Sequence, residues 1–289
     1  MPHKKVILVT GANGQLGMEF KAIAGNYPGY DFIFVTREDF PIDDFGAVES
    51  FFQSTHIDCC INCAAYTAVD QAESDRGNAF YINGAAAGNL ARCCHIHDVR
   101  FIHFSTDYVF NGRADRPYLE TDPTDPVNGY GESKLNGELE TIKHNPEAII
   151  IRTSWVYSSF GKNFVKTMLR LMKEKESISV VEDQHGCPTY ANDLARAVMQ
   201  IIEQENKPGI YNYCNAGAIS WYQFAEAIRE ISKLNCKVNP IPTSAYPTPA
   251  KRPAYSVLDT NKIRNTFNIQ IPNWKDSLIN CMELLKDNS

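Results

Sequence analysis

The chain of 289 residues lacks a long apolar run and lacks an excess of positive charge. A helix that spans a membrane needs about 20 consecutive, mostly apolar residues, and no segment here reaches that length. The 28 lysines and arginines are outnumbered by 34 aspartates and glutamates, which gives a formal net charge of −6. General nucleic-acid binders usually carry a basic excess. We therefore expect no membrane partner and no nucleic-acid partner, which leaves small anionic ligands open.

We also expect no secretion signal, and the sequence shows no internal repeat and no paired-cysteine metal motif. Its first residues, Met-Pro-His-Lys-Lys, run straight into an apolar, β-branched segment. The nine cysteines are an odd number, and the Cys-x-x-Cys spacing of Cys60 and Cys63 has no second pair to accompany it. Structural zinc sites need such a second pair, and disulfide scaffolds are typical of secreted chains. We expect reduced thiols in packing roles, a cytoplasmic location and no metal.

Short apolar strands alternate with helical segments in the first half of the chain. The expected strands are 5–10, 32–35, 58–62, 101–104 and 148–152, and the expected helices are 15–24, 45–54, 75–95 and 133–143. This alternation predicts an α/β fold with a Rossmann-type, doubly wound, mostly parallel sheet covered on both faces.

Past residue 153 the pattern changes to shorter strands and more irregular segments. Strands are expected at 180–181 and 211–213, and helices at 163–174, 192–205, 221–234 and 275–286. Residues 240–249 are too rich in proline for a helix or an inner strand, so they predict an ordered loop around a site. We expect a smaller α/β unit made mainly of residues 154–289, with some later segments able to return to the first unit of residues 1–153.

A glycine-rich loop, Gly-Ala-Asn-Gly-Gln-Leu-Gly over residues 11–17, follows the first strand and opens a helix. Glycines permit a tight turn and the close approach of a pyrophosphate, and a helix N-terminus attracts the anion. The spacing of Gly11, Gly14 and Gly17 differs from the commoner Gly-x-Gly-x-x-Gly, and a plain strand-to-helix turn is the alternative. Its position in an alternating chain favours a dinucleotide, NAD(P)-binding loop, and hence an NAD(P)-binding domain over residues 1–153.

Arg37 lies twenty residues past Gly17, just after the second expected strand. An acidic residue there would bind a ribose diol, whereas an arginine can face a 2′-phosphate. The arginine favours NADPH over NADH, with a solvated surface side chain as the alternative.

Tyr130 and Lys134 stand four residues apart in Tyr-Gly-Glu-Ser-Lys. On a helix this spacing places both side chains on one face. Lowering the pKa of a tyrosine from about 10 to about 7 needs about 4 kcal/mol, and an ammonium about 4 Å away supplies an energy of that order. The pair therefore predicts a proton donor tuned by an adjacent charge, although the same spacing also occurs by chance.

Several longer motifs carry a resemblance to a known family. They are Gly-Ala-Asn-Gly-Gln-Leu-Gly (11–17), Asn-Cys-Ala-Ala-Tyr-Thr-Ala-Val-Asp (62–70), Ser-Thr-Asp-Tyr-Val-Phe (105–110), Tyr-Gly-Glu-Ser-Lys (130–134), Arg-Thr-Ser-Trp-Val-Tyr (152–157) and Pro-Thr-Ser-Ala-Tyr-Pro-Thr-Pro-Ala (242–250). With these motifs the chain resembles the extended short-chain dehydrogenase/reductase family, and within it the dTDP-4-dehydrorhamnose reductases.

The resemblance implies that NADPH (or NADH) gives a hydride to C4 of a dTDP-sugar, dTDP-4-dehydro-β-L-rhamnose. It implies that Tyr130 is the proton donor, that Lys134 lowers its pKa and holds the nicotinamide ribose, and that Thr106 bonds the same substrate oxygen. Substrate contacts are implied for Asp107, Trp155, Asn163 and Arg252. The implied cofactor-binding residues are Gly11, Asn13, Gly14, Gln15, Leu16, Gly17, Arg37, Ile42, Asp43, Ala64, Ala65, Tyr66, Tyr130 and Lys134.

The chain departs from the family pattern at a few positions. Pro41 stands where the family has an aspartate near the adenine, which leaves the choice between NADH and NADPH open. Glu19 matches an acidic position that some members use for a magnesium ion between subunits; we expect a surface side chain and no metal there. Two alternatives stay open, a reductase or epimerase for another nucleotide sugar and a non-catalytic NADP-binding regulatory subunit. The chain could act as a monomer or a homodimer.

Overall fold

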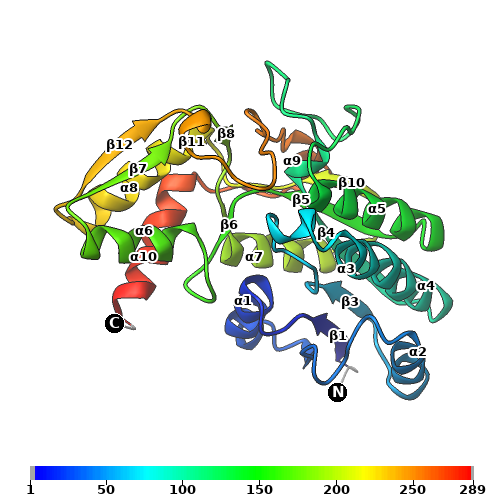
Figure 1. Ribbon diagram of the computed structural model, residues 1–289. Coiled ribbons are helices and arrows are strands. Elements are labelled where there is room, and N and C mark those ends of the chain that lie inside the picture. The colour runs from blue at the N-terminus through cyan, green and yellow to red at the C-terminus, as the bar shows by residue number, and fades with distance from the viewer. Residues whose placement is uncertain (1–3, 288–289) are drawn as a thin grey trace.

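Six parallel strands form one sheet in the order β10-β5-β4-β3-β1-β2 (Figure 1). This computed structural model describes residues 4–287. The strands are β1 (Lys5–Thr10), β2 (Tyr30–Phe34), β3 (Cys59–Asn62), β4 (Arg100–Thr106), β5 (Ile149–Thr153) and β10 (Gly209–Asn212). The order changes direction beside β1, which has β2 on one side and β3 on the other, and ligands bind at such a switch point. The predicted Rossmann-type α/β sheet is confirmed.

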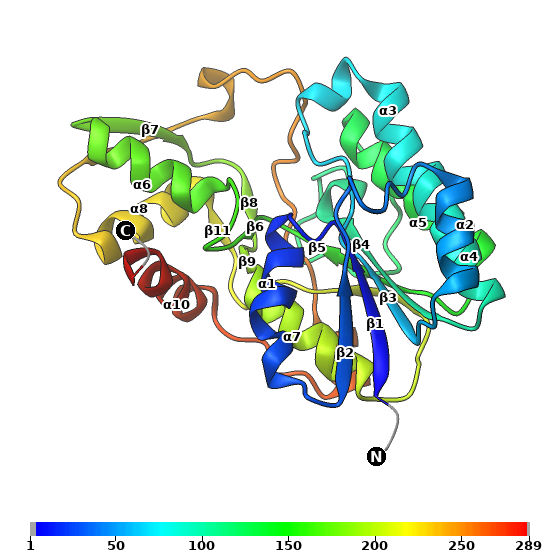
Figure 2. The ribbon, with the colours of Figure 1, turned by 90° about the horizontal axis from the view of Figure 1, so that it is seen from below.

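Helices cover both faces of this sheet (Figure 2). On one face lie α1 (Gln15–Ile23), α7 (Ala191–Ile202) and α9 (Asn261–Phe267), which share an apolar core with the strands. On the other face lie α2 (Phe45–Ser54), α4 (Ala87–Ile96) and α5 (Gly129–His144). The inner strands β3, β4 and β5 are buried on both sides because helices cover both faces.

The helix predicted over 75–95 is divided in the structure. A 3₁₀ turn, η2 (Gln71–Glu73), leads to α3 (Arg76–Phe80), then to a π-helical turn, η3 (Tyr81–Ala86), and on to α4. The π turn turns Asn83 inward, where its amide accepts from the Tyr66 backbone N–H at 2.8 Å and donates to the Ser133 hydroxyl at 2.9 Å. Asn83 thereby ties the loop after β3 to α5, and π turns of this kind often occur near functional sites.

Helix α5 begins at Gly129, four residues before the predicted start at Ser133. The Asn128 side chain caps it by accepting the Gly131 backbone N–H at 2.7 Å. The glycines at 129 and 131 have low helix propensity, so the sequence pattern predicted a helix start that is too late. Tyr130 therefore lies inside the first turn, on the same helix as Lys134.

A smaller unit with its own apolar core lies beside the sheet. It contains β7 (Ser177–Val181), β12 (Lys237–Ile241), α6 (Phe164–Glu174), α8 (Trp221–Ser232) and α10 (Trp274–Asp287). Pro240 lies in β12, which pairs only with β7 among the described strands, so this proline is in a two-stranded edge and removes no bond of the main sheet. The chain then crosses between the units more than once, because α7 and β10 return to the main sheet after α6 and β7.

The remaining elements are short. They are β6 (Val156–Tyr157), β8 (His185–Gly186), β9 (Thr189–Tyr190), β11 (Ile219–Ser220) and the 3₁₀ turns η1 (Ala24–Asn26), η4 (Asp107–Val109) and η5 (Thr243–Ala245). All nine cysteines are free, and all but the half-buried Cys63 are buried, as expected for packing thiols. Within residues 4–287 no helix has the length and apolar character needed to span a membrane.

Candidate active site

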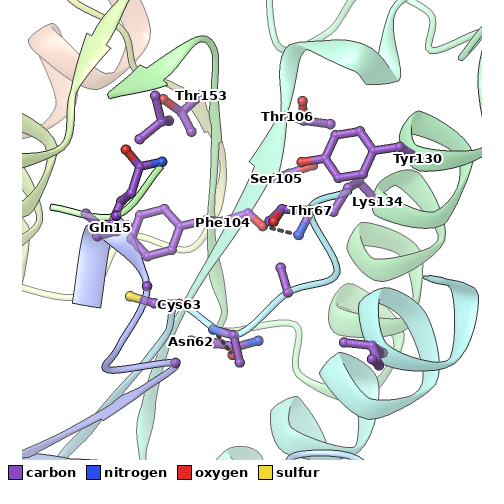
Figure 3. A pocket seen from close by; sticks show the side chains of 18 of the residues that line it. Gln15, Asn62, Cys63, Thr67, Phe104, Ser105, Thr106, Tyr130, Lys134 and Thr153 are labelled. Carbon is purple, nitrogen blue, oxygen red and sulfur yellow. Dashed lines mark hydrogen bonds between the residues drawn. The ribbon is translucent and has the colours of Figure 1, made fainter. Parts of the chain in front are cut away.

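A cavity of about 890 Å³ lies at the carboxyl ends of β1, β3 and β4 and extends to the smaller unit. Figure 3 shows Tyr130, Lys134, Ser105 and Thr106 on one side of it and Gln15 on the other. Many of the residues predicted from the sequence line this cavity. They are Gly11, Asn13, Gly14, Gln15, Leu16, Arg37, Ile42, Asp43, Ala64, Ala65, Thr106, Asp107, Tyr130, Lys134 and Trp155.

The glycine loop provides one wall of the cavity. Gly11 has a φ of +61°, and a Cβ on it would lie 2.7 Å from the Ala64 nitrogen, so no larger residue fits. Gly14 is the N-cap of α1 and makes no side-chain cap, which leaves backbone N–H groups of the first turn to face a ligand. Free backbone N–H groups at a helix N-terminus, next to glycines that have no side chain, can bind the pyrophosphate of a dinucleotide. Gly17 packs behind the loop, where a Cβ would lie 2.5 Å from the Gly11 oxygen, and it does not line the cavity.

Arg37 lies at the rim of the cavity next to the segment after β2. Its guanidinium is 3.6 Å from the Asp43 carboxylate, and 76% of its side chain is exposed. Ile42 is buried beside them and completes this end of the cavity. The end therefore offers a cation for a phosphate and an apolar surface for a flat ring.

The Tyr130 hydroxyl points into the cavity near Ser105 (Figure 3). The expected lowering of its pKa is wrong for this arrangement, because burial and the Asp107 carboxylate raise the pKa of Tyr130 to about 12. The Thr106 hydroxyl opposes this rise. The Lys134 ammonium donates to the Phe104 carbonyl oxygen at 2.6 Å and is held toward β4. Tyr130 therefore keeps its proton at neutral pH, which is the form that a proton donor requires.

Lys134 is fully within the protein, with 3% of its surface exposed. Burial lowers the pKa of Lys134 to about 8, and the Glu138 carboxylate opposes this change. Glu138 follows one helical turn later and accepts two bonds from the Arg152 guanidinium, at 2.8 and 2.7 Å. Arg152 in turn donates to the Glu120 backbone oxygen at 3.2 Å.

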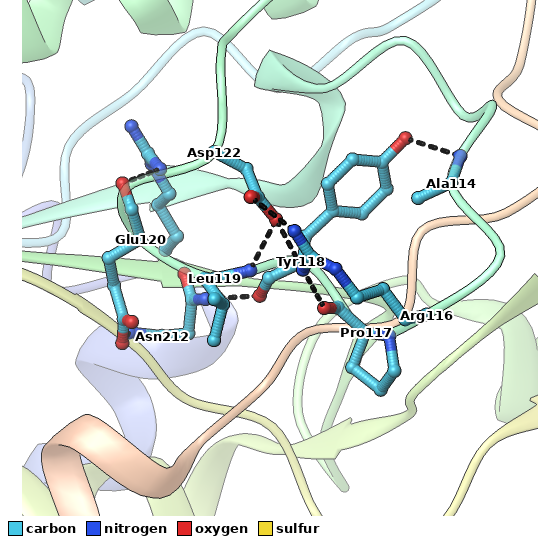
Figure 4. A network of polar contacts seen from close by, with 9 residues as sticks. Ala114, Arg116, Pro117, Tyr118, Leu119, Glu120, Asp122 and Asn212 are labelled. Atoms are coloured by element: carbon cyan, nitrogen blue, oxygen red, sulfur yellow. Dashed lines mark hydrogen bonds and ion pairs between the residues drawn. The ribbon is translucent and has the colours of Figure 1, made fainter.

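The segment that contains Glu120 is itself anchored to the sheet (Figure 4). The Glu120 carboxylate accepts the Asn212 backbone N–H at 2.8 Å, and the Asn212 amide donates to the Tyr118 backbone oxygen at 2.9 Å. Asp122 accepts two bonds from Arg116, at 2.9 and 2.7 Å. These contacts hold Arg152, and through it Glu138, in place beside α5.

Thr106 and Asp107 end β4 at the floor of the cavity. The Thr106 hydroxyl donates to Asp107 Oδ1 at 3.0 Å and also accepts the Tyr108 backbone N–H. Burial raises the pKa of Asp107 to about 7, with the Ser256 and Thr106 hydroxyls opposing the rise. Asp107 Oδ2 is buried and has no hydrogen-bond partner among the described residues, so it is free to meet a polar ligand.

The smaller unit contributes an aromatic wall made of Trp155, which was predicted from the sequence, and Trp221, which was not. Trp155 has a φ of +47° and stacks on Trp221, with ring centroids 3.5 Å apart and planes at 10°. Gly186 also lies against Trp155, since a Cβ there would be 2.6 Å from the Trp155 ring. Trp221, the first residue of α8, was not predicted as a site residue. Its 66-residue separation from Trp155 leaves no local signal to find it.

Asn163, Arg252 and Tyr66 do not line the cavity. Asn163 caps α6 and donates to the Gln15 side chain at 2.9 Å, so it supports a lining residue. Arg252 makes two bonds of 2.8 Å to Asp70, which lower the pKa of that carboxyl and join the loop after β3 to the proline-rich segment. Tyr66 contributes its backbone to Asn83.

Glu19 was expected at the surface, and this expectation is wrong. The residue is 1% exposed, and its carboxylate accepts from Ser158 at 2.6 Å and from Asn192 at 2.9 Å. Burial raises the pKa of Glu19 despite these bonds. The position faces inward because α1 packs on α7 and on the loop before α6.

Known proteins are similar to this chain over nearly its whole length. Residues 4–286 match the family model of the RmlD substrate binding domain. The chain is 40% identical over 295 residues to a dTDP-4-dehydrorhamnose reductase of Burkholderia thailandensis, which covers 96% of this chain and 97% of that protein.

Two solved structures are also similar over nearly their whole length. A dTDP-4-dehydrorhamnose reductase of Clostridium acetobutylicum is 40% identical with a TM-score of 0.93, covering 97% of this chain and 99% of that one. The Bacillus anthracis enzyme of the same name, solved in complex with NADP, is 37% identical with a TM-score of 0.94, covering 98% and 100%.

Proposed function

We propose that this chain, which belongs to the RmlD family of dTDP-4-dehydrorhamnose reductases, reduces the C4 ketone of dTDP-4-dehydro-β-L-rhamnose with NADPH. The product would be dTDP-L-rhamnose, a precursor of polysaccharides. The observation that carries the proposal is a single cavity that joins the uncapped N-terminus of α1 to a protonated Tyr130. A ketone reduction needs one hydride source and one proton source, and the cavity provides a place for each.

The residues for the cofactor lie on the main sheet. The backbone at Gly11 and Gly14 would hold the pyrophosphate, and Arg37 would face the 2′-phosphate that distinguishes NADPH from NADH. When bound, NADPH supplies the hydride. The NADP complex of the Bacillus anthracis relative supports this assignment.

Proton delivery is the task of the α5 side of the cavity. The Tyr130 phenol gives its proton to the substrate oxygen, which is an alkoxide and a stronger base than phenolate, so the transfer is favourable even with a pKa of about 12. The Thr106 hydroxyl would turn from Asp107 Oδ1 to donate to the same oxygen and stabilise its negative charge. The buried Lys134 ammonium lies one helical turn after Tyr130 on α5, and its positive charge would stabilise the phenolate that forms.

The smaller unit would bind the sugar. The stacked rings of Trp155 and Trp221 give a flat apolar surface, and Asp107 Oδ2 offers an unused acceptor for a hydroxyl. We propose accordingly that the main sheet binds the coenzyme and that residues of the smaller unit, with Asp107, bind the nucleotide sugar.

The test is the consumption of reduced coenzyme by purified protein with a panel of 4-keto nucleotide sugars, each with NADPH and with NADH. We expect the fastest turnover with dTDP-4-dehydro-β-L-rhamnose and NADPH. Faster turnover with another 4-keto sugar would reassign the substrate. Coenzyme binding without turnover of any ketone would contradict the reductase and leave a binding protein.

A further inference from the structure

The loop between β6 and α6 lies against the first two turns of α1 (Figures 1 and 2). The Ser158 hydroxyl donates to Glu19 at 2.6 Å, and the Asn163 amide donates to Gln15 at 2.9 Å. Between them Gly161 has a φ of +64° and packs so closely that a Cβ would lie 3.0 Å from Gln15 Cγ. A loop of the smaller unit is thus fixed beside the glycine loop of the sheet.

Lys162 occupies the next position of this loop and lines the cavity together with Gly14 and Gln15. Its side chain is exposed and forms no ion pair with any residue in the described range 4–287. The first turn of α1 has no acidic residue, and Glu19 one turn later is already bonded to Ser158 and Asn192. An ammonium and a helix N-terminus therefore line the same cavity, and neither is paired with a carboxylate of the described residues.

We propose that Lys162 is a further cofactor-binding residue, whose ammonium holds the pyrophosphate of the dinucleotide from the side of the smaller unit. This inference rests on the proposed function for the identity of the ligand. A lysine binds phosphate as a point charge, and a helix N-terminus adds backbone donors to the same anion. Its neighbour Gln15 belongs to α1, which favours the pyrophosphate of the coenzyme over that of the nucleotide sugar.

The position of Lys162 separates its role from that of Arg37. Arg37 lies past the end of β2 and pairs with Asp43, where a 2′-phosphate would discriminate NADPH from NADH. Lys162 would face the pyrophosphate, which both coenzymes share. Loss of its charge should therefore weaken both coenzymes to a similar extent.

The experiment measures dissociation constants of NADPH, NADH and dTDP by calorimetry for the wild type, Lys162→Gln and Lys173→Gln. Lys173 is exposed near the end of α6 and does not line the cavity, so Lys173→Gln matches the change in net charge. For Lys162→Gln we expect both coenzymes to bind about tenfold more weakly, the loss typical of one charge-assisted hydrogen bond. This loss should shrink at high salt, while dTDP binding and the control variant stay unchanged.

Other results would overturn the assignment. Weaker NADPH binding alone would move Lys162 to the 2′-phosphate, weaker dTDP binding alone would move it to the substrate, and unchanged constants would remove it from the site. Lys162→Arg should retain most of the affinity, since it keeps the charge. A wild type that binds coenzyme but reduces no ketone would contradict the proposed reaction and leave the test of Lys162 intact.

Discussion

The two walls of the cavity are built in different ways. The wall on the main sheet is made of backbone from consecutive residues, with Gly11 and Gly14 in one turn between β1 and α1. The wall on the smaller unit is made of the side chains of Trp155 and Trp221, which come from two separate segments, and Gly186 from a third segment packs against the Trp155 ring. The first depends on local conformation and the second on tertiary packing.

This difference follows from what each wall is proposed to bind. A pyrophosphate is held by backbone N–H groups, and the turn that presents them needs glycine at fixed local positions. A sugar ring is held by an aromatic surface, which any part of the chain can supply once it is folded. Tyr130 and Thr106 line the same cavity as the two walls, and we propose that they contact the ligands of both.

The largest effect is expected where the walls meet. Tyr130→Phe removes the hydroxyl that is proposed to donate the proton and keeps the ring, so turnover should fall by about 10²-fold or more. Coenzyme binding should survive, because the glycine wall is untouched. Steady-state turnover and calorimetric NADPH binding on the same preparation measure the two quantities. Unchanged turnover would remove Tyr130 from the mechanism.

Gly11→Ala should distort the glycine loop on the sheet side of the cavity and leave the aromatic wall unchanged. The new Cβ would lie 2.7 Å from the Ala64 nitrogen at a φ of +61°, which forces the loop apart. Strain of about 1–3 kcal/mol at such a position should weaken NADPH binding by tens of fold and lower the melting temperature. The constant for dTDP should change much less. If both ligands lose affinity equally, the walls are not independent.

Gly186→Ala is the matched change in the aromatic wall. The Cβ would lie 2.6 Å from the Trp155 ring and push it from its stack with Trp221. Overpacking of this kind costs about 1–3 kcal/mol, and we expect the KM for the nucleotide sugar to rise about tenfold. The dissociation constant of NADPH should stay near the wild-type value. A larger loss of NADPH affinity than of sugar affinity would contradict the assignment of this wall.

The same contrast explains how much the sequence could predict. The parallel sheet, the glycine loop and the Tyr130 and Lys134 pair depend on short-range spacing, and the structure brings all of them to one cavity. The contacts of Trp221, the inward position of Glu19 and the Asp70 partner of Arg252 depend on residues far apart in the chain. The raised pKa of Tyr130 was missed for the same reason, because burial and the direction of the Lys134 ammonium are set by the packing of α5 on β4.

The smallest effect is expected at Glu138, which lies one turn after Lys134 on α5. The Lys134 ammonium, with a pKa of about 8, is present below that pH and is lost above it, so turnover should decline on the alkaline side. The Glu138 carboxylate raises the pKa of Lys134 and so opposes the effect of burial. The Phe104 carbonyl oxygen accepts a hydrogen bond from the Lys134 ammonium, and burial lowers the pKa of His103, which stays neutral. Glu138→Gln should therefore move the decline to lower pH by about half a unit, a change of about twofold in rate at pH 8.

The control is Glu140→Gln on the same helix, whose carboxylate pairs with Lys143 and His144 at the surface. It should leave the pH profile of turnover unchanged. Glu138→Gln also weakens the buried pair with Arg152, so it should unfold more easily, but a loss of stability alone lowers activity at every pH and does not displace the alkaline limb. A shift of the alkaline decline in Glu138→Gln but not in Glu140→Gln would support a role for the Glu138 charge in turnover. The glycine loop on the sheet side of the cavity can be recognised from the sequence, but this charge is held in place by residues from distant segments.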